Sequence, residues 1–175
     1  LKDSGALVRA RAVVARSQLL KDHLIDFLQQ TLQDSSWWVR SKTADVIDSL
    51  PAVVKETFIF EAIKDSAVQV RVNTILNLVN TTTPLVITLV ENKLKSKDLS
   101  ERYSALATIY SQQQPNMMTL LNDCYLNSQE KKFQDIRTDI ISIFASVNTA
   151  ETTSYLKTAL SDINPRLAYS AYKEL

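Results

Sequence analysis

Residues that commonly catalyse reactions or bind metals are scarce in this chain. Its one histidine, His23, would need help from cysteine or carboxylate side chains to hold zinc. Its one cysteine, Cys124, cannot form an intrachain disulfide and is expected to be a buried, inert thiol. A single glycine, Gly5, excludes the glycine-rich loops that bind phosphate groups. We therefore predict a chain that is not an enzyme, with no catalytic residues, no metal and no cofactor.

The composition is that of an ordinary soluble domain. Of the 175 residues, 45% are hydrophobic and 22% are charged, and the formal net charge is +1. This balance argues against a nucleic-acid-binding domain, which normally has a clear excess of basic residues. No apolar stretch approaches the ~18 residues that a membrane span needs. The single cysteine fits a reducing compartment and favours the cytoplasm. Because the chain starts at Leu1 and not at methionine, we expect a piece of a longer protein.

An internal repeat of 31 residues organises the chain. Arginines stand at positions 9, 40, 71 and 102, each 31 residues after the last. Apolar positions keep the same interval, as Leu28, Ile59 and Val90 illustrate. The arginine expected at position 133 is instead Arg137, so the turn before it carries about four extra residues. A fixed period of this length indicates an array of stacked supersecondary units.

Each unit is expected to consist of two helices joined by a short polar turn. Apolar residues recur at helical spacing, and prolines stand where helices should begin, because the first turn tolerates a missing N–H. The prolines are Pro51, Pro84, Pro115 and Pro165. First helices are predicted over 20–32, 51–63, 84–95, 115–126 and 149–160. Second helices are predicted over 6–18, 37–50, 68–80, 99–112, 133–147 and 164–174. Repeat junctions then fall near residues 19, 50, 81, 113 and 148 of one domain, 1–175.

The pattern Leu-x-Asp-x-x-x-x-Val-Arg, present from Leu32 to Arg40, resembles the HEAT repeat. The short period is similar to the compact HEAT-like units first described in phycobilisome lyases. This resemblance implies an all-α fold, a right-handed α–α superhelix or solenoid of about six helix pairs. In the family, the turn aspartate and the arginine form a ladder of hydrogen bonds and ion pairs between repeats. Carried over, the ladder residues are Asp3, Arg9, Asp34, Arg40, Asp65, Arg71 and Arg102.

Some positions depart from this pattern. Ser96 and Glu101 stand where the pattern has aspartate and valine, and an insertion precedes Arg137, so the fourth and fifth turns are expected to be irregular. Asp162 and Arg166 are four residues apart instead of six, so they fit the ladder only approximately.

The repeat also distinguishes the two adjacent tryptophans. Trp37 occupies a position that is apolar in every copy and is expected to pack between helices, whereas Trp38 occupies a position that tolerates polar residues and is expected to be partly exposed. In HEAT-like solenoids the second helices line the concave side. The resemblance therefore predicts a partner-binding groove there, around Trp38, Lys42, Asn73 and Leu76. Its stripe continues through Leu7, Arg11 and Val14.

These features favour a non-enzymatic scaffold that binds a protein, a peptide or another domain of the same chain. Three alternatives stay open. The chain would serve as an accessory segment of a larger enzyme, because similar arrays occur in some bacterial zinc aminopeptidases and beside cyclophilin-type prolyl isomerases. HEAT-like DNA glycosylases use tryptophan, aspartate and arginine, and Trp38 and Asp45 lie on adjoining turns, but the chain lacks the positive charge that phosphate binding needs. Bilin lyase activity would rest on the repeat type alone.

Overall fold

Helices account for all the regular secondary structure of the described residues. The structure is a computed structural model that describes residues 3–19, 23–78, 83–113 and 116–175. Within these ranges it contains eleven α-helices and two short 3-10 helices, and no strand. The prediction of an all-α protein is therefore confirmed, whereas the right-handed solenoid of HEAT repeats stays a prediction. None of the described helices is long and apolar enough to cross a membrane.

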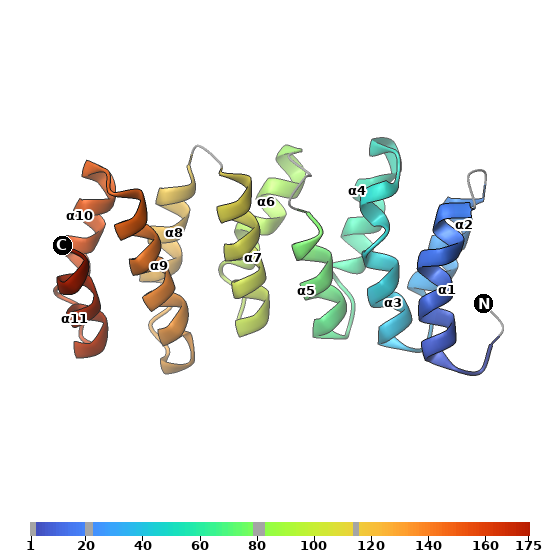
Figure 1. Ribbon diagram of the computed structural model, residues 1–175, viewed down its shortest axis with the longest axis horizontal. Coiled ribbons are helices and arrows are strands. Elements are labelled where there is room, and N and C mark those ends of the chain that lie inside the picture. The colour runs from blue at the N-terminus through green and yellow to red at the C-terminus, as the bar shows by residue number, and fades with distance from the viewer. Residues whose placement is uncertain (1–2, 20–22, 79–82, 114–115) are drawn as a thin grey trace.

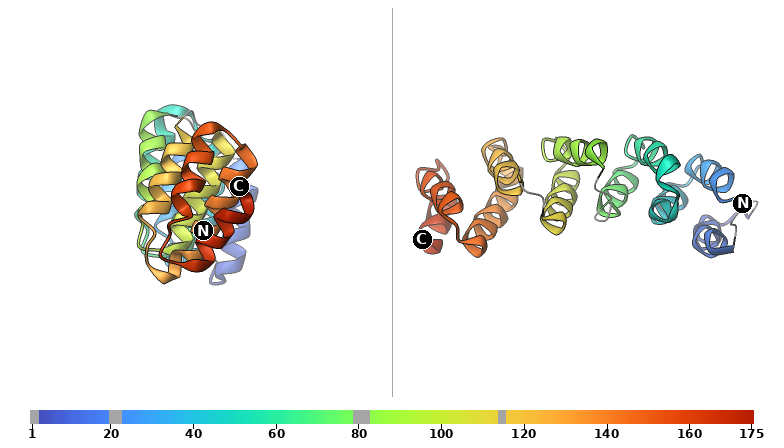
Figure 2. Two further views of the ribbon diagram at one scale, coloured as in Figure 1. Left: turned by 90° about the vertical axis from the view of Figure 1, so that its left-hand side faces the viewer. Right: turned by 90° about the horizontal axis from the view of Figure 1, so that it is seen from above.

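The helices lie in two rows that run the length of the molecule (Figure 1). We call one the inner row because both rows bend gently and it lies on the hollow side (Figure 2, right). The inner row comprises α1 (Ala6–Leu19), α3 (Trp37–Ala44), α5 (Val68–Leu76), α7 (Leu99–Gln112), α9 (Gln134–Val147) and α11 (Pro165–Glu174). The outer row comprises α2 (Leu24–Leu32), α4 (Ala52–Ala62), α6 (Pro84–Lys93), α8 (Met117–Leu126) and α10 (Ala150–Ala159).

The core lies between the two rows. It contains the apolar residues that recur every 31 positions, and Leu28, Ile59, Val90 and Leu121 on successive outer helices are fully buried. Burying one such aliphatic side chain stabilises the fold by about 1.5–3 kcal/mol. The periodic apolar positions therefore hold each outer helix onto the inner row.

The helix starts follow the sequence signals. Pro84 and Pro165 are the first residues of α6 and α11, and the side chains of Thr83 and Asn164 cap them by accepting backbone N–H groups. Pro51 directly precedes α4. Pro115 lies outside the described residues, as does the predicted junction near residue 81.

The second helix expected over 37–50 ends early, which corrects the prediction. α3 stops at Ala44, and a 3-10 turn, η1 (Ile47–Ser49), follows. After Asp45 the backbone hydrogen bonds change from i→i−4 to i→i−3, since the Val46, Ser49 and Leu50 N–H groups donate to the carbonyls of Thr43, Val46 and Ile47. Val46 and Ile47 are β-branched, and the Ser49 hydroxyl donates a 2.6 Å hydrogen bond to the Val46 carbonyl. Similarly, α5 ends at Leu76, short of the predicted residue 80. The junctions near 113 and 148 are left-handed residues, Gln113 (φ 47°) and Asn148 (φ 48°), which end α7 and α9.

The inner row is interrupted between α7 and α9. The other successive inner helices pack directly against each other, but α7 and α9 approach less closely (Figure 1). Tyr103 stands where the earlier inner helices carry Ala10, Ser41 and Val72, and its bulkier side chain lies near α9. The extra turn residues also enter here as η2 (Lys131–Phe133), which buries Phe133. The Tyr103 ring and the inserted η2 turn therefore lie where α7 and α9 would otherwise pack directly against each other.

Candidate functional site

Side chains in the turns before α1, α3, α5, α7 and α11 accept a backbone N–H in the same way. The Oδ1 atoms of Asp3, Asp34 and Asp65 each accept the backbone N–H two residues ahead, at 2.7, 2.9 and 2.8 Å. The Ser96 hydroxyl accepts the equivalent N–H at 3.1 Å, and Asp162 does so at 2.9 Å. This local bond favours a tight turn over continued helix. It also leaves the second carboxylate oxygen free to accept from a neighbour.

The arginines connect successive turns. Arg9 donates two 2.8 Å hydrogen bonds to the carboxylate of Asp34, one repeat ahead, and its third nitrogen donates to the Asp3 carbonyl at 2.8 Å. Arg40 makes the same contacts with Asp65, at 2.6 and 2.9 Å, and with the Asp34 carbonyl at 2.7 Å. Each guanidinium therefore ties the carbonyl of its own turn to the aspartate of the next turn, a geometry that suits its planar fork of donors.

These contacts change the acidity of the aspartates. The Arg9 guanidinium holds the pKa of the Asp34 carboxyl below its ordinary value. Burial alone would raise the pKa of Asp65, but hydrogen bonds from Arg40 and the Ala67 N–H outweigh it and lower the pKa.

At the fourth turn, before α7, Glu101 takes the place of the turn aspartate in the ladder. Arg71 donates to the Glu101 carboxylate and, at 2.7 Å, to the Asp65 carbonyl. Glu101 also accepts from Lys93 at 3.0 Å and from the Ser96 hydroxyl at 2.8 Å. The aspartate that is missing at position 96 is thus replaced by Glu101, five residues later in the first turn of α7. A fixed sequence pattern does not predict this replacement.

The last two rungs differ from the expectation. Arg102 bonds the Ser96 carbonyl and, at 2.5 Å, the Ser128 hydroxyl, and its guanidinium lies 3.9 Å above the Phe133 ring. No carboxylate pairs with Arg102 in the part of the chain that the structure describes. The partner of Asp162 is Arg137, not Arg166, and the Tyr125 hydroxyl donates to the same carboxylate at 2.5 Å.

We expect Arg71→Ala to destabilise the protein more than Lys42→Ala. Loss of Arg71 removes one of the three donors to the Glu101 carboxylate and the guanidinium donor to the carbonyls of Asp65 and Ser66, at a cost of about 1–3 kcal/mol. Lys42 is more exposed and pairs only with Asp45, so its loss should change the free energy of unfolding by no more than about 0.5 kcal/mol. Urea unfolding followed by circular dichroism compares the two. Equal urea midpoints for the two variants would show that the contacts of Arg71 stabilise the protein no more than the Lys42–Asp45 pair does.

The structure brings together two of the four residues expected in the binding groove. Trp38 and Lys42 line a hollow of about 320 Å³ between α1 and α3. Its remaining lining residues are Leu7, Ala10, Arg11 and Val14. We call this hollow the α1–α3 groove. The 31-residue repeat predicted three of these lining residues, because each stands 31 positions before a residue of the same stripe on α3. They are Leu7, Arg11 and Val14, which correspond to Trp38, Lys42 and Asp45.

The other two predicted groove residues lie on α5, outside the hollow. The Asn73 amide donates to the Ser41 carbonyl at 2.9 Å and to Asp45 at 2.5 Å, so it ties α5 to α3. Leu76 is an exposed side chain of the same helix. Asp45 also pairs with Lys42 at 2.6 Å and accepts from the Asn77 amide at 3.2 Å. This carboxylate is therefore a junction between α3 and α5.

Trp37 is not packed between helices, which corrects the prediction. Its side chain is 43% exposed, close to the 46% of Trp38, and the two rings stack with centroids 5.7 Å apart. An indole is larger than the half-buried side chains at the equivalent positions, which are Ala6, Val68 and Leu99. It therefore lies over its neighbour, and the pair forms one exposed aromatic surface at the start of α3.

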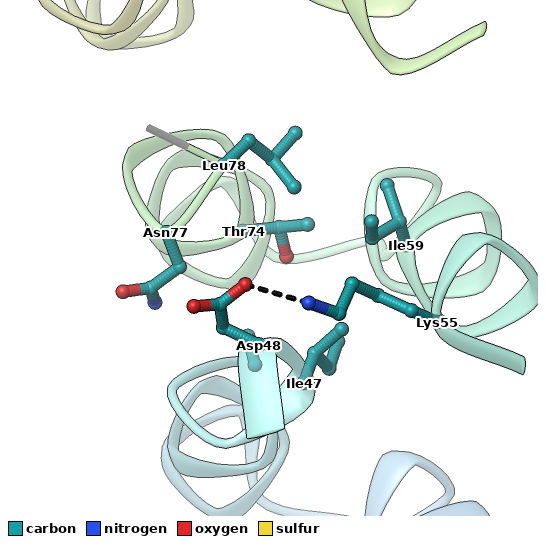
Figure 3. Close-up of a pocket in the computed structure, with 8 residues that line it drawn as sticks. Ile47, Asp48, Lys55, Ile59, Thr74, Asn77 and Leu78 are labelled. Carbon is teal, nitrogen blue, oxygen red and sulfur yellow. Dashed lines mark hydrogen bonds and ion pairs between the residues drawn. The ribbon is translucent and has the colours of Figure 1, made fainter. Parts of the chain in front are cut away.

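No reactive site assembles in the other hollows that the described residues line. In the one drawn in Figure 3, Lys55 pairs with Asp48 at 2.8 Å between η1 and α4, and the space left is too small for a water molecule. Burial raises the pKa of the Cys124 thiol, which donates to the Leu94 carbonyl at 3.7 Å. His23 is exposed beside α2, in a different repeat. Among the described residues, no three histidine, cysteine or acidic side chains come together as metal ligands.

The α1–α3 groove is therefore the feature best suited to a function, and it offers apolar surface and cations instead of reactive groups. No protein-family model matches the chain, and no curated protein matches it in sequence.

Proposed function

We propose that the chain is a HEAT-like solenoid segment that acts as a non-enzymatic scaffold. It binds a segment of another protein, or of another domain of the same chain, on its inner row. The observation that carries the proposal is the α1–α3 groove, a hollow of about 320 Å³ with apolar walls that are open to solvent.

Three exposed apolar side chains line this groove. Leu7 is 48% exposed, Trp38 is 46% exposed and Val14 is 37% exposed, and all three line the same hollow. A contiguous apolar patch on a soluble protein usually marks an interaction site. A large aromatic side chain at its centre provides much contact area at a low cost in side-chain entropy, and a few such residues dominate most interfaces. The groove therefore has the composition of a binding anchor.

The turn ladder supports the same role. Paired arginines and carboxylates hold successive repeats at a fixed spacing along the row. A surface built on rigid elements keeps its shape when a partner binds, which lowers the entropy lost on association. An accessory segment of a larger enzyme would use this surface in the same way, with another domain of its own chain as occupant. Asp45 is already occupied by Lys42, Asn73 and Asn77, which supports a structural role for it instead of a glycosylase-like one.

We expect Trp38→Ala to weaken partner binding by about thirtyfold or more, because truncating an aromatic anchor costs about 2 kcal/mol or more. Its effect on folding should be small, since the side chain is half-exposed. Affinity is measured by titration against the partner that co-purifies with the chain from its source. Tyr172→Ala is the matched control, because Tyr172 is an exposed aromatic residue on α11, at the other end of the row.

Two results would count against this assignment. One is unchanged affinity for Trp38→Ala. The other is hydrogen exchange that the partner slows only in the outer-row helices.

A further inference from the structure

Charge is distributed unevenly along the inner row. Equivalent positions of the first five inner helices follow each other at intervals of 31 residues, and of 35 residues at the last step. The side chain at this position is cationic on the first two helices, neutral on the next two and anionic on the fifth. Its residues are Arg11, Lys42, Asn73, Ser104 and Asp139. The two cations of this series are the ones that line the α1–α3 groove. The apolar groove therefore carries both cations of this register position.

Both cations are available to a ligand. Arg11 is exposed and forms no ion pair with any residue that the structure describes. Lys42 pairs with Asp45 at 2.6 Å, but Asp45 also accepts hydrogen bonds from Asn73 and Asn77. Asp45 thus keeps two donors when the Lys42 ammonium turns toward the groove. An exposed pair of this kind contributes only about 0–1 kcal/mol, so little opposes the change.

The inner-row helix α9 carries negative charge that is not paired within the described residues. Asp135 and Asp139 lie one turn apart on exposed positions of α9, and neither forms an ion pair within the described ranges. Partial desolvation and the charge of Asp135 raise the pKa of Asp139. An acidic ligand is repelled from α9 and attracted to the α1–α3 groove.

We infer that the α1–α3 groove selects an amphipathic protein segment that carries carboxylate side chains beside its apolar ones. This inference rests on the proposed function and names the chemistry of its partner. The groove, at about 320 Å³, is at the lower end of the roughly 300–1,000 Å³ typical of ligand pockets, so it holds one or two apolar side chains. Those side chains contact Leu7, Val14 and Trp38. The carboxylates pair with Arg11, whose planar guanidinium can bind them bidentately, and with Lys42.

The test uses three synthetic helical peptides of about 15 residues with leucine on one face. Their other face carries glutamate, glutamine or lysine. Trp37 and Trp38 are the only two tryptophans in the chain and both are exposed, so a blue shift of intrinsic fluorescence reports occupation of the site. We expect the glutamate peptide to bind at least about tenfold more tightly than the glutamine peptide, and the lysine peptide to bind most weakly. This preference should diminish as salt is added.

Variants assign the preference to the two cations. Arg11→Gln and Lys42→Gln should each reduce affinity for the glutamate peptide by about three- to tenfold and leave affinity for the glutamine peptide unchanged. Lys157→Gln is the matched control, because Lys157 is an exposed lysine on α10, in the outer row. It should leave both affinities unchanged.

The outcomes separate this inference from the proposed function. Equal affinity for the glutamate and glutamine peptides, with both lost in Trp38→Ala, would overturn the charge preference and keep the groove as a binding site. Failure of every peptide to shift the fluorescence would overturn both. Anionic phospholipid vesicles or duplex DNA that bind as tightly as the glutamate peptide would show a general attraction to negative charge, and the inference of a protein segment would be wrong.

Discussion

Asp162→Ala is expected to lower the free energy of unfolding by about 3–5 kcal/mol, the largest single effect in the chain. The side chains of Asp162 and Arg137 are 5% and 4% exposed, so the substitution leaves a buried guanidinium without its counter-charge. It also removes the acceptor of the Tyr125 hydroxyl and of the Asn164 N–H. The Arg137 Nε already has no hydrogen-bond partner, so little compensation is available. Urea unfolding monitored by circular dichroism measures the loss.

Two further variants distinguish burial from charge. Glu130→Ala also removes one carboxylate, but its pair with Lys132 is exposed, so the change should stay within about 0.5 kcal/mol. Combining Asp162→Ala with Arg137→Met removes both charges and should recover part of the loss, because a buried apolar group needs no partner. If Asp162→Ala and Glu130→Ala cost the same, the buried pair contributes no more than a surface one.

The second large effect concerns the substituted rung. Glu101→Val should destabilise the protein by about 2–3 kcal/mol, because the Glu101 carboxylate is 5% exposed and accepts from Arg71, Lys93 and Ser96. Burial alone would raise the pKa of Glu101, yet the hydrogen bonds from Arg71, Ser96 and Lys93 lower it, so the carboxylate is charged and engaged at neutral pH.

Adding Ser96→Asp to Glu101→Val should recover most of this loss. The double change restores the aspartate and valine of the two preceding repeats, in which Asp65 accepts from Arg40 and Val70 is buried. Ser96 already accepts the N–H of Asp98 through its hydroxyl, so an aspartate there can adopt the same turn. Ser96→Asp alone places two carboxylates beside Arg71 and should not stabilise. A double variant as unstable as Glu101→Val would show that an aspartate at position 96 cannot replace Glu101 as the partner of Arg71.

The helical architecture was largely predictable because it depends on local signals. The 31-residue period, the prolines and the scarcity of glycine located the helices, and the described ends of most of them lie within about three residues of the prediction. The early end of α3 was not predictable, since it depends on competing hydrogen bonds around Val46 and Asp45. Hydrogen bonds that occur in one repeat only do not follow the 31-residue pattern, so the pattern cannot predict them.

The site was predictable only in part. The repeat register indicated which stripe of the second helices carries Trp38 and Lys42, and it also contains Arg11. It could not show that Asn73 is engaged by α3, because this contact joins residues of two repeats. The burial assigned to Trp37 was wrong because an average over equivalent positions does not account for the size of an indole. How a large side chain fits, and which residues of neighbouring repeats form hydrogen bonds, become apparent only once the helices are packed together.

The wider spacing between α7 and α9 has a consequence for how the chain unfolds. In a stacked array, each unit contacts only its neighbours, so the coupling between adjacent interfaces sets how cooperatively the array melts. Direct helix contact is continuous from α1 to α7 and resumes from α9 to α11. Across the interruption, the link depends on α8, on Tyr103 and on Arg102 stacked over Phe133. The chain is therefore expected to consist of two cooperative blocks that open with different free energies, with the boundary after α7.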